Sequence, residues 1–176
     1  MGLLSIRTFG DPVLRSPALD VVEFDARLTT LADDMRETMM AAPGVGLAAP
    51  QVGVPRRLFT FDSGEESGAY ANPEIVWRSE EIQEGEEGCL SIPGVYFPVT
   101  RAMKVKVRAQ DLDGSSIEHE AEGFLARIFQ HEIDHLAGVL FVDRLEAEHR
   151  REAMRMIREA ELGLPMTKAT PEARAL

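Results

Sequence analysis

The most regular alternation of hydrophobic and polar positions lies between residues 25 and 42. Apolar side chains recur there at intervals of three and four residues, the spacing of one face of an α-helix, at Leu28, Leu31, Met35 and Met39. Asp25 precedes the run as an N-cap, and Pro43-Gly44 follows it as a stop signal. The pattern therefore predicts a helix over residues 25–42.

Two further helices are expected near the C-terminal end. The first covers residues 123–136, with Gly138 just past its end. The second covers residues 145–162, and the residues on its apolar side are Leu145, Ala153, Met156, Ile157 and Ala160. The last stretch, residues 165–176, is polar and small, so we expect a flexible tail behind a domain that ends at residue 164.

Short apolar runs predict strands at residues 57–62, 75–77, 104–109 and 117–120. Val105 and Val107 alternate with basic residues, and Asp113-Gly114 separates the last two runs, which is typical of a β-hairpin. The chain has no internal repeat. These elements predict an α+β fold, with small antiparallel or mixed β-sheets packed around a central helix, an N-terminal helix and a C-terminal helix.

The composition limits the kinds of molecule that the protein is expected to bind. The chain has 176 residues, enough for one domain, and 44% of them are hydrophobic. Its 30 acidic and 19 basic residues give a net charge of −11, a field that repels DNA and anionic membranes. We find no signal peptide and no membrane span, and the single cysteine, Cys89, excludes an internal disulfide. These features favour the cytoplasm.

Two histidines of the expected helix over residues 123–136 lie four positions apart in the stretch FQHEIDHLAG. Residues at i and i+4 share one helical face, so His131 and His135 can direct their imidazoles to one point. Because Glu132 follows the first histidine, this is the HExxH arrangement of metal-dependent hydrolases, with the glutamate as general base. Phe124 and Ile128 predict an apolar wall beside it. The alternative is a chance pair of surface histidines.

A catalytic metal of this kind normally has three protein ligands. The extension HExxHxxGxxH fails here, because Phe141 occupies the position of its last histidine. Glu146 and His149 lie downstream and would complete a protease-like site. Upstream, Cys89 in EEGCLSIPG is the better candidate, and its alternative role is that of a small buried apolar residue.

A third segment, GVGLAAPQVG at residues 44–53, combines glycines that permit close approach of a ligand with Gln51, whose amide can donate a hydrogen bond. Alone, it is explained equally well by a tight turn into a strand. Together and in this order, GxGxAAxQ, EGCLS and HExxH resemble the three signature motifs of peptide deformylase. The resemblance extends from about residue 4 to about residue 145.

The resemblance implies hydrolysis of the N-formyl group from the initiator methionine of nascent polypeptides, with release of formate. It implies that one divalent metal is held by Cys89, His131 and His135. The metal is commonly Fe(2+) in this family, and Zn(2+), Ni(2+) or Co(2+) can occupy the same ligand set. Glu132 would accept a proton from water and deliver it to the departing amine. The Gln51 amide and the main-chain N–H of Leu90 would stabilise the oxyanion.

The resemblance also implies that the substrate peptide binds in an extended, strand-like manner. The residues expected to bind it are Gly44, Val45, Gly46, Glu87, Gly88, Phe124, Arg127 and Ile128. Apolar walls suit the thioether of methionine. Arg127 has an alternative role, in which its guanidinium points to solvent and pairs with Glu87 or another carboxylate. Residues 93–101, PGVYFPVTR, are expected to form a loop.

Two other functions remain open from the sequence. An HExxH protease would use Glu146 or His149 and would need neither Cys89 nor Gln51. A catalytically silent homologue that binds metal or docks at the ribosome would have lost a working residue, and no such loss is found in the three motifs.

The helix expected over residues 145–162 also carries arginines opposite its apolar side, which stand out on so acidic a chain. This arginine stripe consists of Arg144, Arg151, Arg155 and Arg158. Some deformylases dock at the ribosome through a C-terminal helix, so the resemblance implies a ribosome contact here. The alternative is that Glu148 and Glu152 pair with the stripe on a solvated face.

Overall fold

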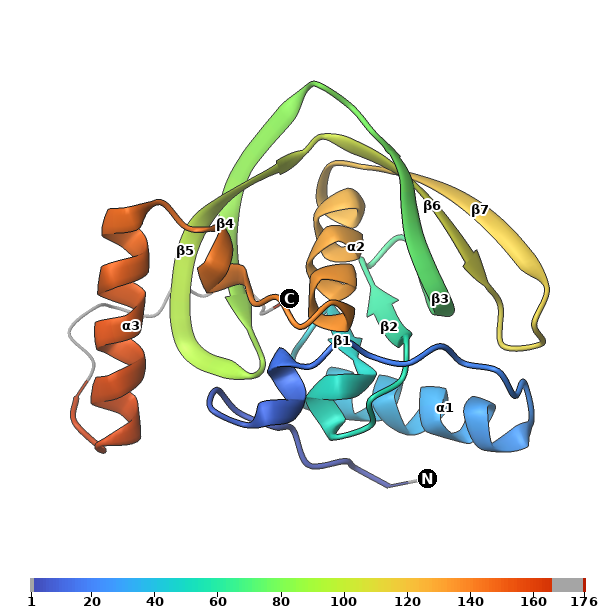
Figure 1. Ribbon diagram of the computed structural model, residues 1–176, viewed down its shortest axis with the longest axis horizontal. Coiled ribbons are helices and arrows are strands. Elements are labelled where there is room, and N and C mark those ends of the chain that lie inside the picture. Colours follow the sequence, from blue (N-terminus) through green and yellow to red (C-terminus); the bar gives the residue numbers. More distant parts are fainter. Residues whose placement is uncertain (1, 166–175) are drawn as a thin grey trace.

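Two antiparallel sheets lie on either side of a central helix in the computed structural model (Figure 1). The structure describes residues 2–165 and residue 176, so the tail expected over residues 165–176 falls almost entirely outside the described part. The larger sheet has the strand order β1 (Gly46–Ala48), β2 (Leu58–Asp62), β3 (Ser67–Arg78), β6 (Lys104–Gln110) and β7 (Ser116–Glu122). The smaller sheet pairs β4 (Ile82–Cys89) with β5 (Ile92–Ala102).

The three predicted helices are confirmed. Helix α1 spans Ala26–Ala41, α2 spans Gly123–Leu136 and α3 spans Ala147–Glu161. The Asp25 carboxylate caps α1 by accepting hydrogen bonds from two main-chain N–H groups, which offsets donors that a helix start leaves unpaired. Short 3-10 turns η1 (Pro12–Arg15), η2 (Ala49–Val52) and η3 (Phe141–Arg144) complete the helical elements of the described residues. The α+β class therefore matches the prediction.

The strand predictions were partly right. The hairpin β6–β7 turns at Asp113-Gly114 as expected, and the run at 57–62 corresponds to β2. The run at 75–77 is only the end of the long strand β3, and β1, β4 and β5 were missed.

The prediction of a loop at residues 93–101 is wrong, because these residues lie in β5. Val95, Phe97, Val99 and Arg101 alternate inward along this strand. In a two-stranded sheet each strand has one unpaired edge, where Pro93 and Pro98 need not donate hydrogen bonds.

Helix α2 is held between two buried clusters. On one side, Phe59 and Phe61 of β2 pack edge-to-face against Phe129 of α2. On the other, β5, η3 and α3 share a cluster that includes Phe97, Phe141 and Met156. A third cluster joins α1 to β1 and β2. Ten of the fourteen α2 residues are buried as a result, so polar side chains on this helix lie in the protein interior.

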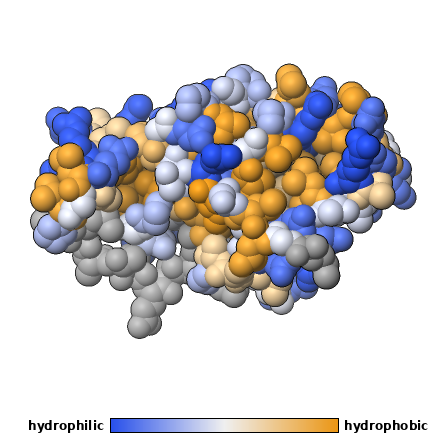
Figure 2. Space-filling model, turned by 90° about the horizontal axis from the view of Figure 1, so that it is seen from below, coloured by the Kyte–Doolittle hydropathy of each residue, from blue (hydrophilic) through white to orange (hydrophobic). Residues whose placement is uncertain are grey.

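The surface mixes apolar and polar residues. On the face seen from below in Figure 1, apolar side chains form an elongated patch across the middle, with polar side chains around it (Figure 2). Among the described residues, no helix combines the length and the apolar character that crossing a membrane requires.

Candidate metal centre

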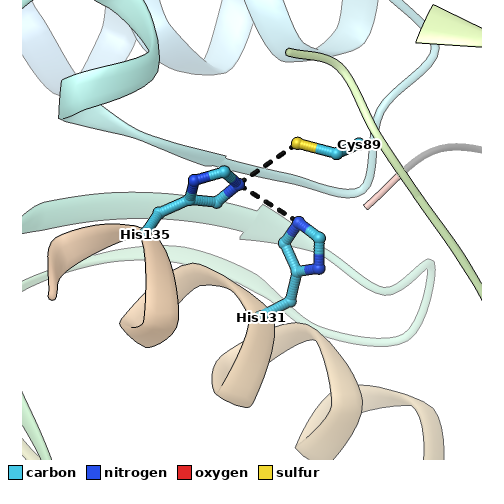
Figure 3. Close-up of side chains that lie close together, drawn as sticks. All are labelled: Cys89, His131 and His135. Carbon is cyan, nitrogen blue, oxygen red and sulfur yellow. Dashed lines mark hydrogen bonds between the residues drawn. The ribbon is translucent and has the colours of Figure 1, made fainter. Parts of the chain in front are cut away.

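Cys89, at the end of β4, faces His131 and His135 of α2 (Figure 3). The Nε2 atom of His135 lies 3.2 Å from Cys89 Sγ and 3.2 Å from His131 Nε2. All three ligand atoms lie within 4.8 Å of one another, and all three residues are buried. One thiol and two imidazoles therefore converge on one point.

The spacing of these atoms fits a small metal ion. Two nitrogens bonded to one tetrahedral ion at about 2.0–2.1 Å lie roughly 3.3 Å apart. The observed Nε2 to Nε2 distance of 3.2 Å is close to that value. Burial lowers the pKa of His135 and so keeps its imidazole neutral, which is the form that binds a metal. Burial also raises the pKa of the Cys89 thiol to about 12, and a nearby divalent cation would offset this effect.

His131 is oriented by a buried carboxylate. Its Nδ1 atom lies 3.1 Å from Glu87 Oε2, which leaves Nε2 directed at the cluster of ligand atoms. Glu87 is fully buried and accepts two hydrogen bonds of 2.9 Å from Arg101 and one of 2.8 Å from Arg127. Burial alone would raise the pKa of Glu87, but the hydrogen bonds from Arg101 and His131 outweigh it and lower the pKa. Glu87 is therefore a carboxylate.

The sequence did not indicate how far this charge network extends. Arg101 also donates to Asp134, which in turn accepts from Arg144 at 2.7 Å. Arg127 is 3% exposed and donates to the main-chain oxygens of Gly85 and Val99. Of its two expected roles, the pairing with Glu87 is observed, but in the interior and not toward solvent. Nothing in the sequence marked Arg101 or Asp134 as a member of this network, apart from the position of Asp134 within the HExxH segment.

Glu132 lies in the protein interior, next to His131 in α2. The residue is fully buried, and within the described residues neither of its carboxylate oxygens has a hydrogen-bond partner. Burial, followed by the nearby charge of Glu87, raises the pKa of Glu132 well above its ordinary value. Gly46 makes this placement possible, because a Cβ at position 46 would overlap the Glu132 carboxylate.

Gln51 is fixed next to Cys89. Its Oε1 atom accepts a hydrogen bond from the Ala48 N–H at 2.8 Å, and this bond sets the orientation of the amide. The Nε2 atom then lies 3.5 Å from Cys89 Sγ and 3.2 Å from Ser91 Oγ. Arg7 and Phe9 hold the two segments together by donating main-chain hydrogen bonds to Gln51 and Ser91. Ser91 is the last residue of EGCLS, and the sequence alone did not indicate its contact with Gln51.

The residues expected to bind substrate come from several elements of the fold. Val45 and Ile128 are buried in the same apolar cluster. Gly44 packs so closely on Leu90 that a Cβ there would lie 2.7 Å from the Leu90 side chain. Gly88 leaves no room for a Cβ beside the Tyr96 ring. Phe124, expected on the same wall as Ile128, is 49% exposed at the start of α2.

Neither alternative ligand reaches the centre. Glu146 is exposed at the start of α3, and the ring of His149 packs on Phe97 with centroids 5.5 Å apart. Within the part of the chain that the structure describes, the only metal-compatible group of three is Cys89, His131 and His135. The arrangement of a protease with a downstream third ligand is therefore excluded for these residues.

A buried thiol and two imidazoles beside a carboxylate with a raised pKa define a mononuclear metal-dependent hydrolase. The family model described as polypeptide deformylase matches residues 3–151. This chain belongs to the polypeptide deformylase family.

Curated relatives and solved structures agree with this assignment. A peptide deformylase of Acidothermus cellulolyticus is 51% identical over 161 residues, which cover 92% of this chain and 89% of the relative. The crystal structure of a peptide deformylase from Legionella pneumophila matches with a TM-score of 0.84 and 45% identity, covering 91% of this chain and 96% of that chain. A peptide deformylase from Synechococcus elongatus, solved in complex with actinonin, matches with a TM-score of 0.83 and 41% identity over 92% of this chain and 87% of that chain.

Proposed function

We propose that this chain is a metal-dependent hydrolase that removes the N-formyl group from the N-terminal formyl-methionine of nascent polypeptides and releases formate, the activity of its family. The observation that carries the proposal is the buried carboxylate of Glu132, free of hydrogen bonds to described residues, beside Cys89, His131 and His135. Formylated chains are substrates made in the cytoplasm, and we expect the enzyme to act there.

We propose Cys89, His131 and His135 as the metal ligands. Thiolate and imidazole donors suit Fe(2+), Zn(2+), Ni(2+) and Co(2+), and we take Fe(2+) as the physiological ion on the basis of the family. When bound, the ion supplies a Lewis acid that polarises the formyl carbonyl and acidifies water.

Glu132 is the proposed proton carrier. A carboxylate attracts a proton from the attacking water, and a raised pKa lets the group hold that proton near neutral pH until the amine leaves. The transfer is balanced, because the hydroxide adds to the formyl carbon, the C–N bond breaks and the amine nitrogen takes the proton from Glu132. Glu132 ends the cycle as it began.

Gln51 and the main chain at Leu90 are the proposed oxyanion donors. The Oε1 atom of Gln51 is occupied by the Ala48 N–H, so its amide N–H groups face the side of Cys89. Leu90 follows Cys89 directly, so its main-chain N–H is close to the proposed metal. Donors fixed before the reaction stabilise developing charge without reorganisation.

Main-chain groups and an apolar wall are the proposed means of substrate recognition. Gly44, Val45, Gly46 and Gly88 would bind the peptide backbone as an added strand, because β1, which begins at Gly46, is an edge strand of the larger sheet and can pair with a further strand. Ile128 and Val45 would contact the methionine side chain, with Phe124 at the exposed rim. Glu87 and Arg127 are buried partners of each other, so we propose that they support this wall from behind.

Formate release from a formyl-methionyl tripeptide by protein loaded with Fe(2+) under anaerobic conditions tests the proposal. The acetylated tripeptide should react far more slowly, because its extra methyl replaces the formyl hydrogen. Glu132→Gln should keep the metal and lose on the order of 10² to 10⁴ in kcat. Equal turnover of formyl and acetyl peptides, or near-normal turnover by the metal-loaded Glu132→Gln variant, would contradict the proposal.

A further inference from the structure

Leu176 lies in the interior beside the candidate metal centre, far along the chain from every other residue of that region. Its side chain is 2% exposed and belongs to the buried cluster that includes Val45, Ile128 and Phe129. Figure 1 shows the end of the chain at residue 176 between β4 and α2. These elements are the ones that carry the three proposed metal ligands.

The main chain of Leu176 is also held there. Its N–H donates to the carbonyl oxygen of Gly88 at 3.3 Å. Gly88 directly precedes Cys89, and the register of the β4–β5 ladder shifts between Glu87 and Cys89. The shift interrupts regular pairing with β5 at Gly88, where another chain segment can form a main-chain hydrogen bond.

These contacts reproduce what the proposed function asks of a substrate. An aliphatic side chain enters the apolar cluster of Val45 and Ile128, and a peptide N–H bonds to β4 next to a metal ligand. Leucine and methionine have similar volume and are exchanged in protein cores at small cost. Leu176 therefore occupies the region assigned above to the methionine of the formylated peptide.

We propose that Leu176 is an internal competitor of the substrate, bound in place of the substrate methionine. The proposal rests on the proposed function, because it assigns the same cluster to methionine. Since Leu176 belongs to the same chain, its occupancy does not depend on enzyme concentration. A substrate that displaces it meets a site of which only a fraction is free, and the apparent affinity is reduced by that fraction.

The kinetic signature follows from competition. A variant in which residue 176 no longer occupies the site should have a lower KM for a formyl-methionyl peptide. Its kcat should be unchanged, because a saturating concentration of substrate displaces Leu176 from the parent protein as well. If one site in ten is free, the decrease in KM is about tenfold. Leu176→Asp is the test variant, because a carboxylate does not enter an apolar cluster. Leu176→Met should behave like the parent.

Leu164→Asp is the matched control. Leu164 lies just after α3 and is 52% exposed, so this variant introduces the same charge without leaving a buried site. Its KM and kcat should equal those of the parent. A measurement that does not depend on turnover accompanies the kinetics, namely the amide ¹H and ¹⁵N chemical shifts of Val45 and Gly88 in the zinc-loaded protein without substrate. They should change in Leu176→Asp and stay constant in Leu164→Asp.

The two readouts separate failure of this inference from failure of the proposed function. If the amide shifts change in Leu176→Asp but neither the parent nor any variant releases formate, the position of Leu176 is supported and the proposed activity is rejected. Unchanged shifts at Val45 and Gly88 in Leu176→Asp would overturn the inference. So would an unchanged KM in an active Leu176→Asp variant, or an equal decrease in KM in Leu164→Asp.

Discussion

The Nδ1 atom of His131 and the Oε2 atom of Glu87 lie 3.1 Å apart in the protein interior. This contact links a proposed metal ligand to a carboxylate that Arg101 and Arg127 hold in place. The orientation of the imidazole therefore depends on charges supplied by β4, β5 and α2 together. The buried ion pairs that Glu87 forms with Arg101 and Arg127 are costly to break by removing one partner, because the other charge then stays buried without compensation.

Replacing Glu87 by glutamine tests that dependence. The amide keeps the shape but loses the negative charge, so we expect metal affinity to fall by about 10- to 100-fold, as is typical when a partner of a metal-binding histidine is removed. Competition with a chelator of known affinity measures the change. Glu84→Gln, at an exposed position of the same strand, should bind metal like the parent. Equal affinities of the two variants would show that Glu87 does not orient the ligand.

The proposed third ligand is tested by Cys89→Ala. Loss of the thiol leaves two ligands, and we expect the purified variant to retain far less than one metal ion per chain by elemental analysis. His149→Ala should retain the full amount, because this ring packs on Phe97 and lies outside the ligand cluster. Full retention in Cys89→Ala would remove Cys89 from the site.

Gly46→Ala should displace the proposed proton carrier. The added Cβ overlaps the Glu132 carboxylate, which lies in a buried position and must shift. A displacement of about 1 Å in a catalytic group can cost on the order of 10² in rate, so we expect kcat to fall by that order while metal content stays constant. Gly2→Ala, where a Cβ meets open space, is the control. A fully active Gly46→Ala enzyme would contradict the assigned role of Glu132.

A pH-dependent contribution to stability is expected from Asp143. Burial raises its pKa, but hydrogen bonds from Arg15 and the Leu140 main chain outweigh burial and lower the pKa below the ordinary value. A depressed folded-state pKa stabilises the protein above the unfolded pKa, and the stabilisation is lost as pH falls through the folded value. Asp143→Asn should therefore cost about 1 kcal/mol in urea unfolding at neutral pH.

The difference between Asp143→Asn and the parent should shrink as the pH is lowered below about 4, because the parent carboxylate then also becomes neutral. Asp33→Asn, at an exposed position of α1, serves as the control. A difference that stays constant over the whole range would mean that the charge of Asp143 makes no contribution.

The arginine stripe, of which Arg144 lies in η3 and the other three members lie in α3, is proposed as a ribosome contact. On the apolar side of the helix, Ala153, Met156 and Ile157 are buried as the sequence indicated, whereas Ala160, expected on the same side, is exposed near the C-terminal end of α3. Arg155 pairs with Glu159 at 2.5 Å, and Arg144 pairs with Asp134 of α2, two acidic partners that the sequence did not indicate. Reversing Arg151, Arg155 and Arg158 to glutamate should abolish salt-sensitive co-sedimentation with ribosomes.

Hydrolysis of a short formyl peptide should be nearly unchanged in this triple variant, because α3 carries none of the proposed ligands. Undiminished co-sedimentation of the variant would assign the stripe to an ordinary solvated helix face. No binding of the parent at low salt would do the same.

The helices and the common direction of His131 and His135 were predictable from the sequence for local reasons. A period of 3.6 residues marks α1, and the i and i+4 spacing of His131 and His135 sets their common direction within a single helix. Cys89 required the combination of three motifs, because nothing local to a lone cysteine says what it faces.

The strands and the charge network were harder to predict, because they depend on distant pairing. The β4 sequence IQEGEEGC has two glycines and three acidic residues, and only pairing with β5 makes it a strand. Arg127 is buried because Glu87, 40 positions earlier, neutralises it. Local composition cannot distinguish such an arginine from a solvated one, which is why the sequence left both roles of Arg127 open.

The proposed ligands come from two elements that meet only in the folded chain. Cys89 and His135 are 46 positions apart, and the contact between them requires the β4–β5 hairpin to dock on α2. An unfolded chain offers at best the two histidines, so the metal binds the native state in preference and acts as a reversible cross-link. At free metal one hundred times the dissociation constant, this preference adds about 2.7 kcal/mol to the free energy of unfolding. Metal supply would then govern how long the enzyme survives as well as how fast it works.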